Sequence, residues 1–412
     1  MIEETCTVAI VGGGTAGLAL AAELQRLDVG KVVVLEREAE AGGIPRHCGH
    51  YSFGLREYGR LFKGPDYARR NRDVAASLGA DIRTGTTVTA LRRGGEMEIL
   101  TNAGRSLLRA QRVVLCMGVR ESSRAQRFVS GDRPGGVITT GALQSMVYLK
   151  GIRPFKRPVI LGSELVSFSA IQTCEHLGIK PVAMVEKADR ILARRLLRPY
   201  LLLKRIPLYS AVRDLRILGR ERVETLKFVD ANGQTQQIEA DGIIISGHFR
   251  PESALLRSSH LEVDHGSGGP VVDQFGRCSD PAYFSAGNLL RAAETSGFCW
   301  REAIETAQRL SVDLKRSAQR QDSSVTVVAS DRAISFIVPQ RLCLNGEPGG
   351  MAQFYMGLNK PVDSTIVARC GNRTLWKGKL KSRPMRRVQL PIAGILAAAP
   401  DTGIRFSLES DH

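Results

Sequence analysis

At 412 residues the chain is longer than one compact core usually accommodates, and we expect two or three domains. Hydrophobic residues make up 43% of it, which is ordinary for a globular protein and excludes a disordered or fibrous chain. Lys and Arg number 58 against 41 Asp and Glu, for a formal net charge of +17. No nucleic-acid-binding motif accompanies this charge, so we expect no nucleic-acid partner.

The cellular location is predicted from what the N-terminal sequence lacks. It carries no basic, apolar and cleavable signal, and no apolar run is long enough to cross a bilayer. We expect a cytoplasmic protein, with attachment to the inner face of the membrane as the alternative. The eight cysteines are scattered without metal-ligand spacing, so we expect no bound metal.

A nucleotide-binding turn opens the chain. An apolar run at residues 7–11 leads at once into Gly12-Gly13-Gly14-Thr15-Ala16-Gly17, and a stretch with helical periodicity follows. Gly12 permits the tight turn, Gly14 lets the backbone approach a pyrophosphate, and Gly17 lets the helix pack on the strand. This order predicts a dinucleotide-binding fold.

A strand-end acid supports the dinucleotide-binding fold, and two further strand ends indicate which dinucleotide is bound. The strand at 31–35 ends in Glu36, where an acceptor for a ribose hydroxyl is expected. Residues 112–118 form an apolar strand that ends in a glycine turn, and residues 283–288 read Tyr-Phe-Ser-Ala-Gly-Asn. Together these segments resemble the two-dinucleotide-binding-domain flavoproteins, which include the pyridine nucleotide–disulfide oxidoreductases, and they favour FAD.

The resemblance implies an α/β fold with two Rossmann-like dinucleotide-binding domains. The FAD-binding domain is expected to be discontinuous, with residues 1–120 and 270–318, and the second Rossmann-like domain is expected at 121–269. The residues expected to contact FAD are Gly12, Gly14, Thr15, Ala16, Gly17, Glu36, Arg37, Gly43, Arg46, Val88, Met117, Gly118, Gly287, Asn288 and Ser296. Asn288 stands where the family usually has Asp, and its amide can still bond cofactor oxygens.

The redox-active cysteine pair of the family's disulfide reductases is absent. In its place the chain reads Gly42-Gly43-Ile44-Pro45-Arg46-His47-Cys48-Gly49-His50, with one cysteine. Thiol–disulfide exchange needs a second thiol, so disulfide reduction is not expected.

Relatives place this segment beside the flavin ring, which makes His47 and His50 candidates for proton transfer during substrate oxidation, with Cys48 a weaker one. Two alternatives remain open. The segment either only walls the cofactor pocket or, as the least favoured hypothesis, binds a metal.

The second nucleotide turn departs from the family's glycine pattern. The strand at 157–161 ends in Gly162, but Glu164 and Ser167 replace the second and third glycines. A carboxylate and a Cβ at the second position oppose a pyrophosphate. We therefore predict a Rossmann-like domain in which NAD(P) binding is weak or absent.

This combination narrows the resemblance to the FAD subunits of opine and amino-acid dehydrogenases and of hydrogen cyanide synthase. The motifs that carry it are the Gly42–His50 segment, Phe53-Gly54, Ala286-Gly287-Asn288-Leu289-Leu290 and Glu294-Thr295-Ser296-Gly297-Phe298-Cys299-Trp300-Arg301-Glu302. The resemblance implies a small-molecule substrate and a second flavoprotein subunit or other electron-transfer partner. A homo-oligomer is the alternative assembly. Such subunits often carry a cysteine-rich iron–sulfur segment near the C-terminus, which this sequence lacks.

The C-terminal region changes to a period-two pattern. A helix is predicted from Gly297 to about Arg316, and the polar residues 315–324 read as a linker. Seven strand candidates follow, at 325–329, 334–338, 352–358, 365–370, 374–380, 387–390 and 404–408. They predict a small antiparallel β-sandwich at 324–412 that docks a partner or a second copy. Trp376, among lysines, is either an exposed interface anchor or part of the sandwich core.

Two basic stretches have open roles. Residues 187–222 contain 11 basic and 3 acidic side chains, and residues 369–387 contain 8 basic and none acidic. Within the first, residues 190–205 are basic and amphipathic. This segment either covers the second nucleotide fold, which we favour, or lies on anionic lipid.

The sequence therefore predicts an FAD-dependent dehydrogenase subunit that oxidises an amino acid, an opine or a related substrate and passes electrons to a partner protein or quinone. One alternative is a self-sufficient NAD(P)H-dependent flavin reductase. Another is a non-catalytic FAD module that relays electrons or holds a complex together.

Overall fold

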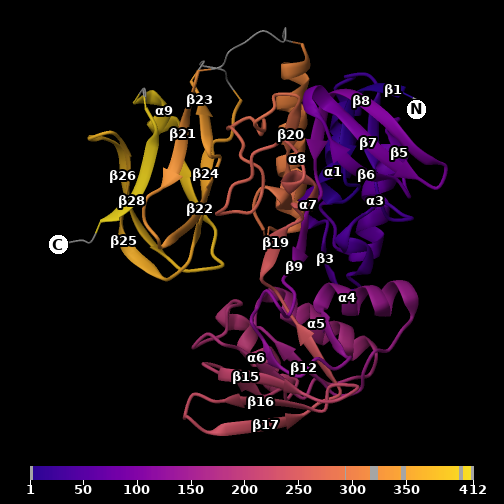
Figure 1. Cartoon of the computed structure of the whole chain (residues 1–412), viewed down its shortest axis with the longest axis vertical. Helices are drawn as coiled ribbons and strands as arrows, with labels where there is room; N and C mark the ends of the chain where they lie inside the picture. The colour runs from indigo at the N-terminus through magenta and orange to yellow at the C-terminus, as the bar shows by residue number, and fades with distance from the viewer. Residues whose placement is uncertain (1–2, 293, 316–322, 345–348, 399–401, 410–412) are drawn as a thin grey trace. The chain divides into compact units, whose positions relative to one another are not determined.

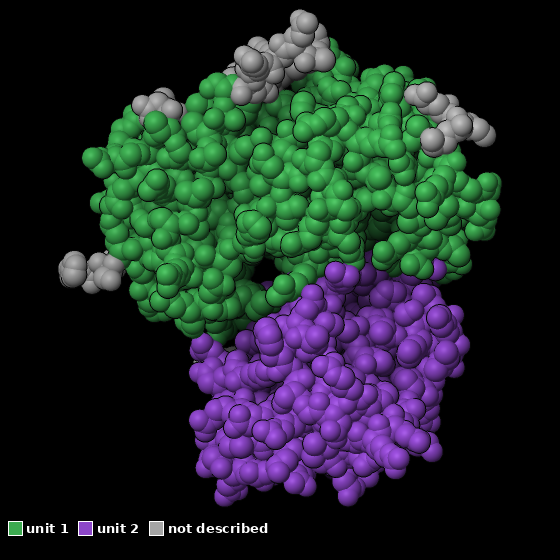
Figure 2. Space-filling view, viewed as in Figure 1, with its two compact units in different colours: residues 1–43, 68–119, 250–412 green, residues 44–67, 120–249 purple. Residues whose placement is uncertain are grey.

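The computed structural model describes residues 3–292, 294–315, 323–344, 349–398 and 402–409 (Figure 1). The chain forms two compact units, drawn in green and purple in Figure 2. The first unit contains residues 1–43, 68–119 and 250–412, and the second contains residues 44–67 and 120–249. The segment 44–67 thus belongs to the second unit although it falls inside the range predicted for the FAD-binding domain, and the segment 250–269 belongs to the first.

A seven-stranded sheet forms the centre of the first unit. Its strands lie in the order β5 (Asp81–Arg83), β2 (Val32–Leu35), β1 (Glu3–Val11), β8 (Gly104–Leu115), β7 (Glu96–Thr101) and β6 (Thr87–Leu91), with β20 (Tyr283–Ser285) paired to β8. The pairs from β5 through β8 to β20 are parallel, and the pairs that include β7 are antiparallel. Because parallel strands end at the same edge, the glycine turns after β1, β8 and β20 share one edge of the sheet.

Alternate side chains of β1 enter two different cores. Val8 and Ile10 pack with helices α1 (Thr15–Arg26) and α8 (Ser296–Leu314). Ala9 and Val11 enter a core on the opposite face that is shared with the C-terminal strands. This burial on both faces explains why β2 and the last four residues of β1, 8–11, are continuously apolar rather than alternating.

The second unit is built on a five-stranded parallel sheet. Its order is β11 (Val137–Thr139), β18 (Gly242–Ile245), β12 (Pro158–Leu161), β13 (Ala183–Val185) and β14 (Leu208–Tyr209). A four-stranded sheet holds β10 (Ser130–Gly131), β15 (Arg213–Leu218), β16 (Thr225–Val229) and β17 (Thr235–Glu239). The helices of this unit include α2 (Leu55–Tyr58), α4 (Thr140–Gln144), a π-helix η3 (Ser145–Leu149), α5 (Leu165–His176) and α6 (Arg198–Leu203). The order of strands and helices after β12 is the one expected for a Rossmann-like fold.

The C-terminal residues form two sheets within the first unit. The larger has the order β23 (Arg341–Cys343), β21 (Ser324–Ala329), β28 (Ile404–Glu409), β25 (Val362–Cys370) and β26 (Arg373–Ser382). The smaller contains β22 (Ile334–Val338), β24 (Gln353–Leu358) and β27 (Val388–Pro391), and helix α9 (Ala393–Ala397) follows. Phe354 of β24 and Phe406 of β28 stack edge to face with their ring centroids 5.3 Å apart, so side chains of both sheets share one core.

One expectation about this region needs correction. The sheets are not purely antiparallel, because β21 pairs with β28 in parallel. Of the two roles left open for Trp376, the structure favours packing in the sandwich, because the side chain is half-buried against the hydrophobic core and its ring lies over Gly378. The predicted linker falls mostly on residues 316–322, which lie outside the described residues. Across the described part of the chain, no helix has the length and apolar character needed to cross a membrane.

Candidate functional site

The first glycine turn lies at the carboxyl end of β1 and leads directly into α1. A side chain at Gly17 would place its Cβ 2.0 Å from the Gly12 carbonyl oxygen, so only glycine lets the helix lie this close to the strand. At Gly14, by contrast, a Cβ would meet only Gly43, at 3.8 Å. Gly14 is the N-cap residue of α1 and has no side chain with which to cap it. The first N–H groups of α1, from Thr15 on, are therefore presented to an anion.

Glu36 is buried at the end of β2 and is hydrogen-bonded to this turn. Its Oε2 accepts a hydrogen bond from the Gly13 N–H at 2.9 Å, and its Oε1 accepts one from the Glu38 N–H at 2.9 Å. Each carboxylate oxygen can accept a further bond, so this carboxylate is fixed in place and can still bind hydroxyl donors. Arg37 is exposed and pairs with Glu38 at 3.7 Å.

The Gly42-Gly43 segment contacts the glycine turn from the other side. The Gly42 N–H donates to the Gly13 carbonyl oxygen at 2.7 Å. Gly43 has a φ of +63°, and a Cβ there would lie 2.8 Å from the Gly14 Cα. Both glycines thus contact the backbone of the turn. With no side chains there, the backbone of both segments can approach an extended ligand closely.

The end of β8 completes this edge of the first sheet. A Cβ on Gly12 would lie 2.6 Å from the Cys116 carbonyl oxygen and 3.3 Å from the Met117 Cα. Met117 and Gly118 are half-buried there. Val88 lies elsewhere, in β6, where it packs against the hydrophobic core. Of these predicted residues, Met117 thus lies beside the glycine turn.

The turn after β20 contacts the start of α1. A Cβ on Gly287 would lie 2.8 Å from the Ala16 Cβ, and the Gly287 N–H donates to Glu302 Oε2 at 2.9 Å. The Asn288 amide makes two hydrogen bonds to the backbone of Glu294. Its Nδ2 donates to the carbonyl at 3.1 Å, and its Oδ1 accepts from the N–H at 2.8 Å. Asn288 therefore closes the loop before α8, and its role as a cofactor ligand stays a prediction.

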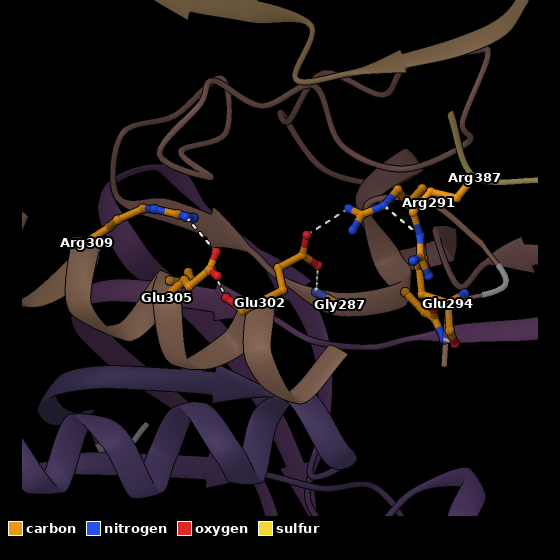
Figure 3. Close-up of polar contacts among 9 residues, drawn as sticks. Gly287, Arg291, Glu294, Glu302, Glu305, Arg309 and Arg387 are labelled. Carbon is orange, nitrogen blue, oxygen red and sulfur yellow. Dashed lines mark hydrogen bonds and ion pairs between the residues drawn. The ribbon is translucent and has the colours of Figure 1, made fainter. Parts of the chain in front are cut away.

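A buried arginine secures the same loop (Figure 3). Arg291 is 4% exposed, and its Nη1 donates to Glu302 Oε1 at 2.8 Å. Its Nε lies 3.4 Å from Glu294 Oε1, and its guanidinium lies over the Tyr355 ring, 3.8 Å from the centroid. Burial alone would lower the pKa of Arg291, but the carboxylates of Glu302 and Glu294 outweigh it and raise the pKa. The Arg291 guanidinium therefore stays charged in this buried position because the two carboxyl groups lie beside it.

The C-terminal region also contacts this loop, through Arg387. Its Nε donates to Glu294 Oε1 at 2.9 Å, and its Nη2 bonds the second oxygen of that carboxylate. The guanidinium lies over the Phe298 ring, 3.5 Å from the centroid. Ser296, predicted to contact the cofactor, is half-buried and begins α8 after the N-cap Thr295. The start of α8 is therefore held by side chains from the C-terminal sheets.

The candidate catalytic segment belongs to the second unit. Arg46, His47 and Cys48 follow one another at a 3-10 turn, η1 (Ile44–His47), where Arg46 and His47 are half-buried. The Cys48 thiol is buried, with its Sγ 3.4 Å from the Ile44 carbonyl oxygen and 3.6 Å from Gln144 Oε1. Burial raises the pKa of Cys48 to about 12, so the thiol stays protonated at neutral pH. This environment makes Cys48 a poor base or nucleophile.

His50 lies in a half-buried, mostly neutral environment. Its Nε2 is 3.4 Å from the Ser169 hydroxyl, and its ring lies 5.7 Å from the Phe53 ring. Burial lowers the pKa of His50, so the ring is neutral at pH 7. Among the described residues, His50 Nδ1 and the Gln144 Nε2 are buried without a hydrogen-bond partner. Two such atoms near Cys48 fit a segment that binds a polar ligand.

Glu164 occupies the second nucleotide turn. It is the N-cap residue of α5, and the residue is 6% exposed. Its Oε1 accepts from the His248 N–H at 3.0 Å, and a Cβ on Gly247 would lie 2.4 Å from the Glu164 Cδ. Burial raises the pKa of Glu164 to about 7. The side chain thus fills the space between the turn after β12 and the turn after β18.

Two more charged groups occupy the same edge of the second sheet. Glu121 accepts hydrogen bonds from the N–H groups of Gly141 and Gly247, at 2.7 and 3.0 Å. Arg127 donates to the carbonyl oxygens of Ser246 and Leu161, at 2.7 and 3.4 Å. Burial raises the pKa of Glu121 and lowers that of Arg127. Backbone groups that a dinucleotide could use are already bonded to these side chains.

The strand-end acid of the second fold repeats the arrangement at Glu36. Glu186 is buried at the end of β13, and its Oε1 accepts from the Ala188 N–H at 2.9 Å. Its Oε2 accepts from the Ser163 hydroxyl at 2.7 Å, where Glu36 accepts from a glycine N–H. The Ser163 hydroxyl also accepts from the Leu192 N–H at 2.9 Å. The second turn therefore keeps the Rossmann arrangement but is closed by its own side chains.

Sequence reasoning missed several of these residues. Glu302 lies in a motif used for the family resemblance, so its position carried a usable signal, but its partner Arg291 did not stand out. Glu121 is the last residue of the strand β9 (Val119–Glu121), and Arg127 follows it in a stretch with no recognisable motif. Arg387 acts across the 93 residues that separate it from Glu294, and only the structure reveals that contact.

Comparison with known proteins identifies the family. The sequence matches the model of the pyridine nucleotide-disulphide oxidoreductase family over residues 6–309. A subunit of the opine oxidase of Rhizobium meliloti is 24% identical over 346 residues, which cover 75% of this chain and 62% of that protein. A probable ferredoxin reductase of Castellaniella defragrans is 26% identical over 293 residues, which cover 68% of this chain and 67% of that protein. The chain thus spans less than two thirds of the length of the opine oxidase protein.

Among solved structures, the thioredoxin reductase of T. acidophilum superposes with a TM-score of 0.63 at 23% identity, covering 75% of this chain and 99% of that chain. This likeness confirms the predicted fold with two dinucleotide-binding domains. The family resemblance drawn from the sequence is also confirmed. The chain belongs to the pyridine nucleotide-disulphide oxidoreductase family and is a flavin oxidoreductase of that family.

Proposed function

We propose that this chain is an FAD-dependent dehydrogenase subunit that oxidises an amino acid, an opine or a related small substrate and passes the electrons to a partner protein or quinone. The observation that carries the proposal is the contrast between the two nucleotide turns. At the first, the backbone around Gly14 is open and Glu36 is fixed beside it. At the second, the Glu164 carboxyl packs on Gly247.

The residues of the first turn fit FAD. The N–H groups at the start of α1 would hold the pyrophosphate, and Glu36 would accept the ribose hydroxyls. The loop that Asn288 closes would bind the ribityl end. When bound, FAD supplies a two-electron acceptor for oxidation of a C–N or C–O bond.

Proton transfer in this proposal falls to His47 and His50. His50 suits the role of a base because burial keeps its ring neutral at pH 7. Cys48 is the weakest of the three candidates, because its buried thiol has a pKa of about 12. The partner is inferred from the similarity to the opine oxidase protein of Rhizobium meliloti, which is itself one subunit of its enzyme.

A self-sufficient NAD(P)H-dependent reductase is the second candidate. The similarity to a probable ferredoxin reductase favours it, and the occupied second turn opposes it.

The experiment that separates the two candidate functions uses the purified protein, its released cofactor and anaerobic mixing. We expect FAD on mass analysis, and bleaching of its visible absorbance by an amino acid or opine but not by NADH. A colourless protein that FAD does not reconstitute would overturn the proposal, and rapid bleaching by NADH would favour the reductase.

The occupied turn makes a separate prediction about nucleotide binding. Glu164→Gly removes both the charge and the volume over Gly247, whereas Glu164→Gln keeps the volume. We expect the glycine variant to bind NADH at least about ten-fold more tightly than the unchanged protein, and the glutamine variant to gain much less. Titration of NADH fluorescence measures both. Equal gains would assign the obstruction to charge alone, and no gain in either would contradict the role given to Glu164.

A further inference from the structure

Three leucines of one short segment of the second unit are strongly exposed. Leu196, Leu202 and Leu203, here named the leucine patch, are 85%, 72% and 77% exposed. They lie on the 3-10 turn η4 (Arg195–Leu197) and on α6, which follows it directly (Figure 1). Single exposed leucines are common on protein surfaces, but three within eight residues of one helical segment form a patch.

The opposite face of this segment packs normally. Leu201, which directly precedes Leu202, is 2% exposed, and Ile191 and Ile206 are buried in the same core. The segment therefore covers the second nucleotide fold, as we favoured from the sequence. That role accounts for the buried side chains only, because it gives the leucine patch no partner.

Basic residues flank the patch in sequence. Arg194, Arg198 and Arg205, here named the basic rim, are exposed, and none has a carboxylate within ion-pair distance among the described residues. The neighbouring Lys204 does pair with Glu175, at 2.8 Å. Exposed leucines interspersed with unpaired arginines match the composition of helices that lie in the interface of an anionic bilayer.

A protein partner accounts for the patch less well. Binding hot spots in protein interfaces are enriched in Trp, Tyr and Arg, and leucine is under-represented among them. A bilayer, in contrast, accepts projecting aliphatic side chains without needing a shaped groove, and its phosphates attract arginine.

We propose that the leucine patch inserts into the headgroup region of an anionic lipid bilayer while the basic rim contacts the lipid phosphates. This attachment is peripheral, because only a short segment takes part. It is independent of the proposed activity, and it would bring the protein to the surface where a membrane quinone is found.

Cosedimentation of the full chain with vesicles tests the proposal. We expect binding to phosphatidylcholine vesicles that contain about one third phosphatidylglycerol, weak binding to phosphatidylcholine alone, and loss of binding at high salt. The double variant Leu202→Ser/Leu203→Ser should bind the anionic vesicles at least about ten-fold more weakly. Because both side chains are exposed, the double variant should fold normally and give the same circular dichroism spectrum as the unchanged protein.

Leu165→Ser is the matched control, because Leu165 is also an exposed leucine of the second unit, at 63%, but lies outside the patch. It should bind vesicles as the unchanged protein does. Absence of binding to anionic vesicles, or equal losses in the patch and control variants, would overturn the proposal. So would a dimer, seen by sedimentation velocity, that the double variant dissociates, because the patch would then belong to an interface between copies.

Discussion

Arg291→Met is expected to destabilise the first unit by about 3–5 kcal/mol, the cost typical of breaking a buried ion pair from one side. Arg291 is 4% exposed, and its removal leaves the Glu302 carboxylate, 8% exposed, bonded to the Gly287 N–H alone. Met fills a similar volume, so the loss comes from the uncompensated charge rather than from a cavity. Because Glu302 also fixes the turn at Gly287, we expect the variant to release its flavin more readily.

Urea unfolding followed by tryptophan fluorescence measures this effect, because Trp300 and Trp376 both belong to the first unit. Arg26→Met is the matched control, since Arg26 pairs with Glu23 at 3.3 Å on the exposed side of α1 and should cost at most about 1 kcal/mol. The double variant Arg291→Met/Glu302→Gln should recover part of the loss, because it removes both charges. A loss below about 1 kcal/mol for Arg291→Met, or strictly additive effects in the double variant, would contradict the coupling.

The first nucleotide fold was predictable because its determinants are local. Gly12, Gly17 and Glu36 act through backbone sterics and through positions at strand ends, which a sequence displays directly. The departure at Glu164 was equally visible as a missing glycine. Where its carboxyl group goes was not predictable, because that depends on the turn after β18, which follows in the sequence more than 80 residues later.

For the candidate site, the sequence predicted which residue types are present but not how buried each side chain is or which partners it has. Cys48 and His50 lie two residues apart and both are residue types that can transfer protons, but burial raises the pKa of Cys48 and lowers that of His50. The contact between Arg387 and Glu294 joins residues of two separately predicted domains. Such a pair leaves no trace in local pattern, because each side chain alone resembles an ordinary charged surface residue.

The C-terminal sheets show a third limit. Period-two alternation located β22, β24 and β28, but alternation describes the faces of a strand and not its neighbours. The pairing of β21 with β28 joins the first and the last strand of the region. Its parallel direction depends on how the chain runs through all the strands between them, which alternation does not reveal. Strand β23, with three residues, is too short to show a period and was missed.

Glu164→Gln is expected to stabilise the second unit more at pH 8 than at pH 5. The folded-state pKa of Glu164, about 7, lies above its ordinary value of 4.5, chiefly because of burial. The His248 N–H and Arg127 oppose this shift, and Glu186 and Glu121 add to it. A carboxyl group with a raised pKa holds its proton more tightly in the folded protein than in the unfolded chain. Its protonated form therefore contributes fully below about pH 4.5, and that contribution is lost as the pH rises through 7.

The size of the effect follows from the difference between the two pKa values. At pH 8 the charged, buried carboxylate costs about 3 kcal/mol, and at pH 5 most of that cost is absent. Glutamine has nearly the same volume and no charge, so it should recover about 2–3 kcal/mol more at the higher pH.

Both tryptophans lie in the first unit, so amide hydrogen exchange in β12 and β18 is the suitable measurement for the second unit. Asp189→Asn, at an exposed acid of the same unit, reports the effect of removing one negative charge without burial. A gain from Glu164→Gln that is equal at both pH values would mean that Glu164 is already charged at pH 5, and that the second turn holds a carboxylate rather than a neutral acid.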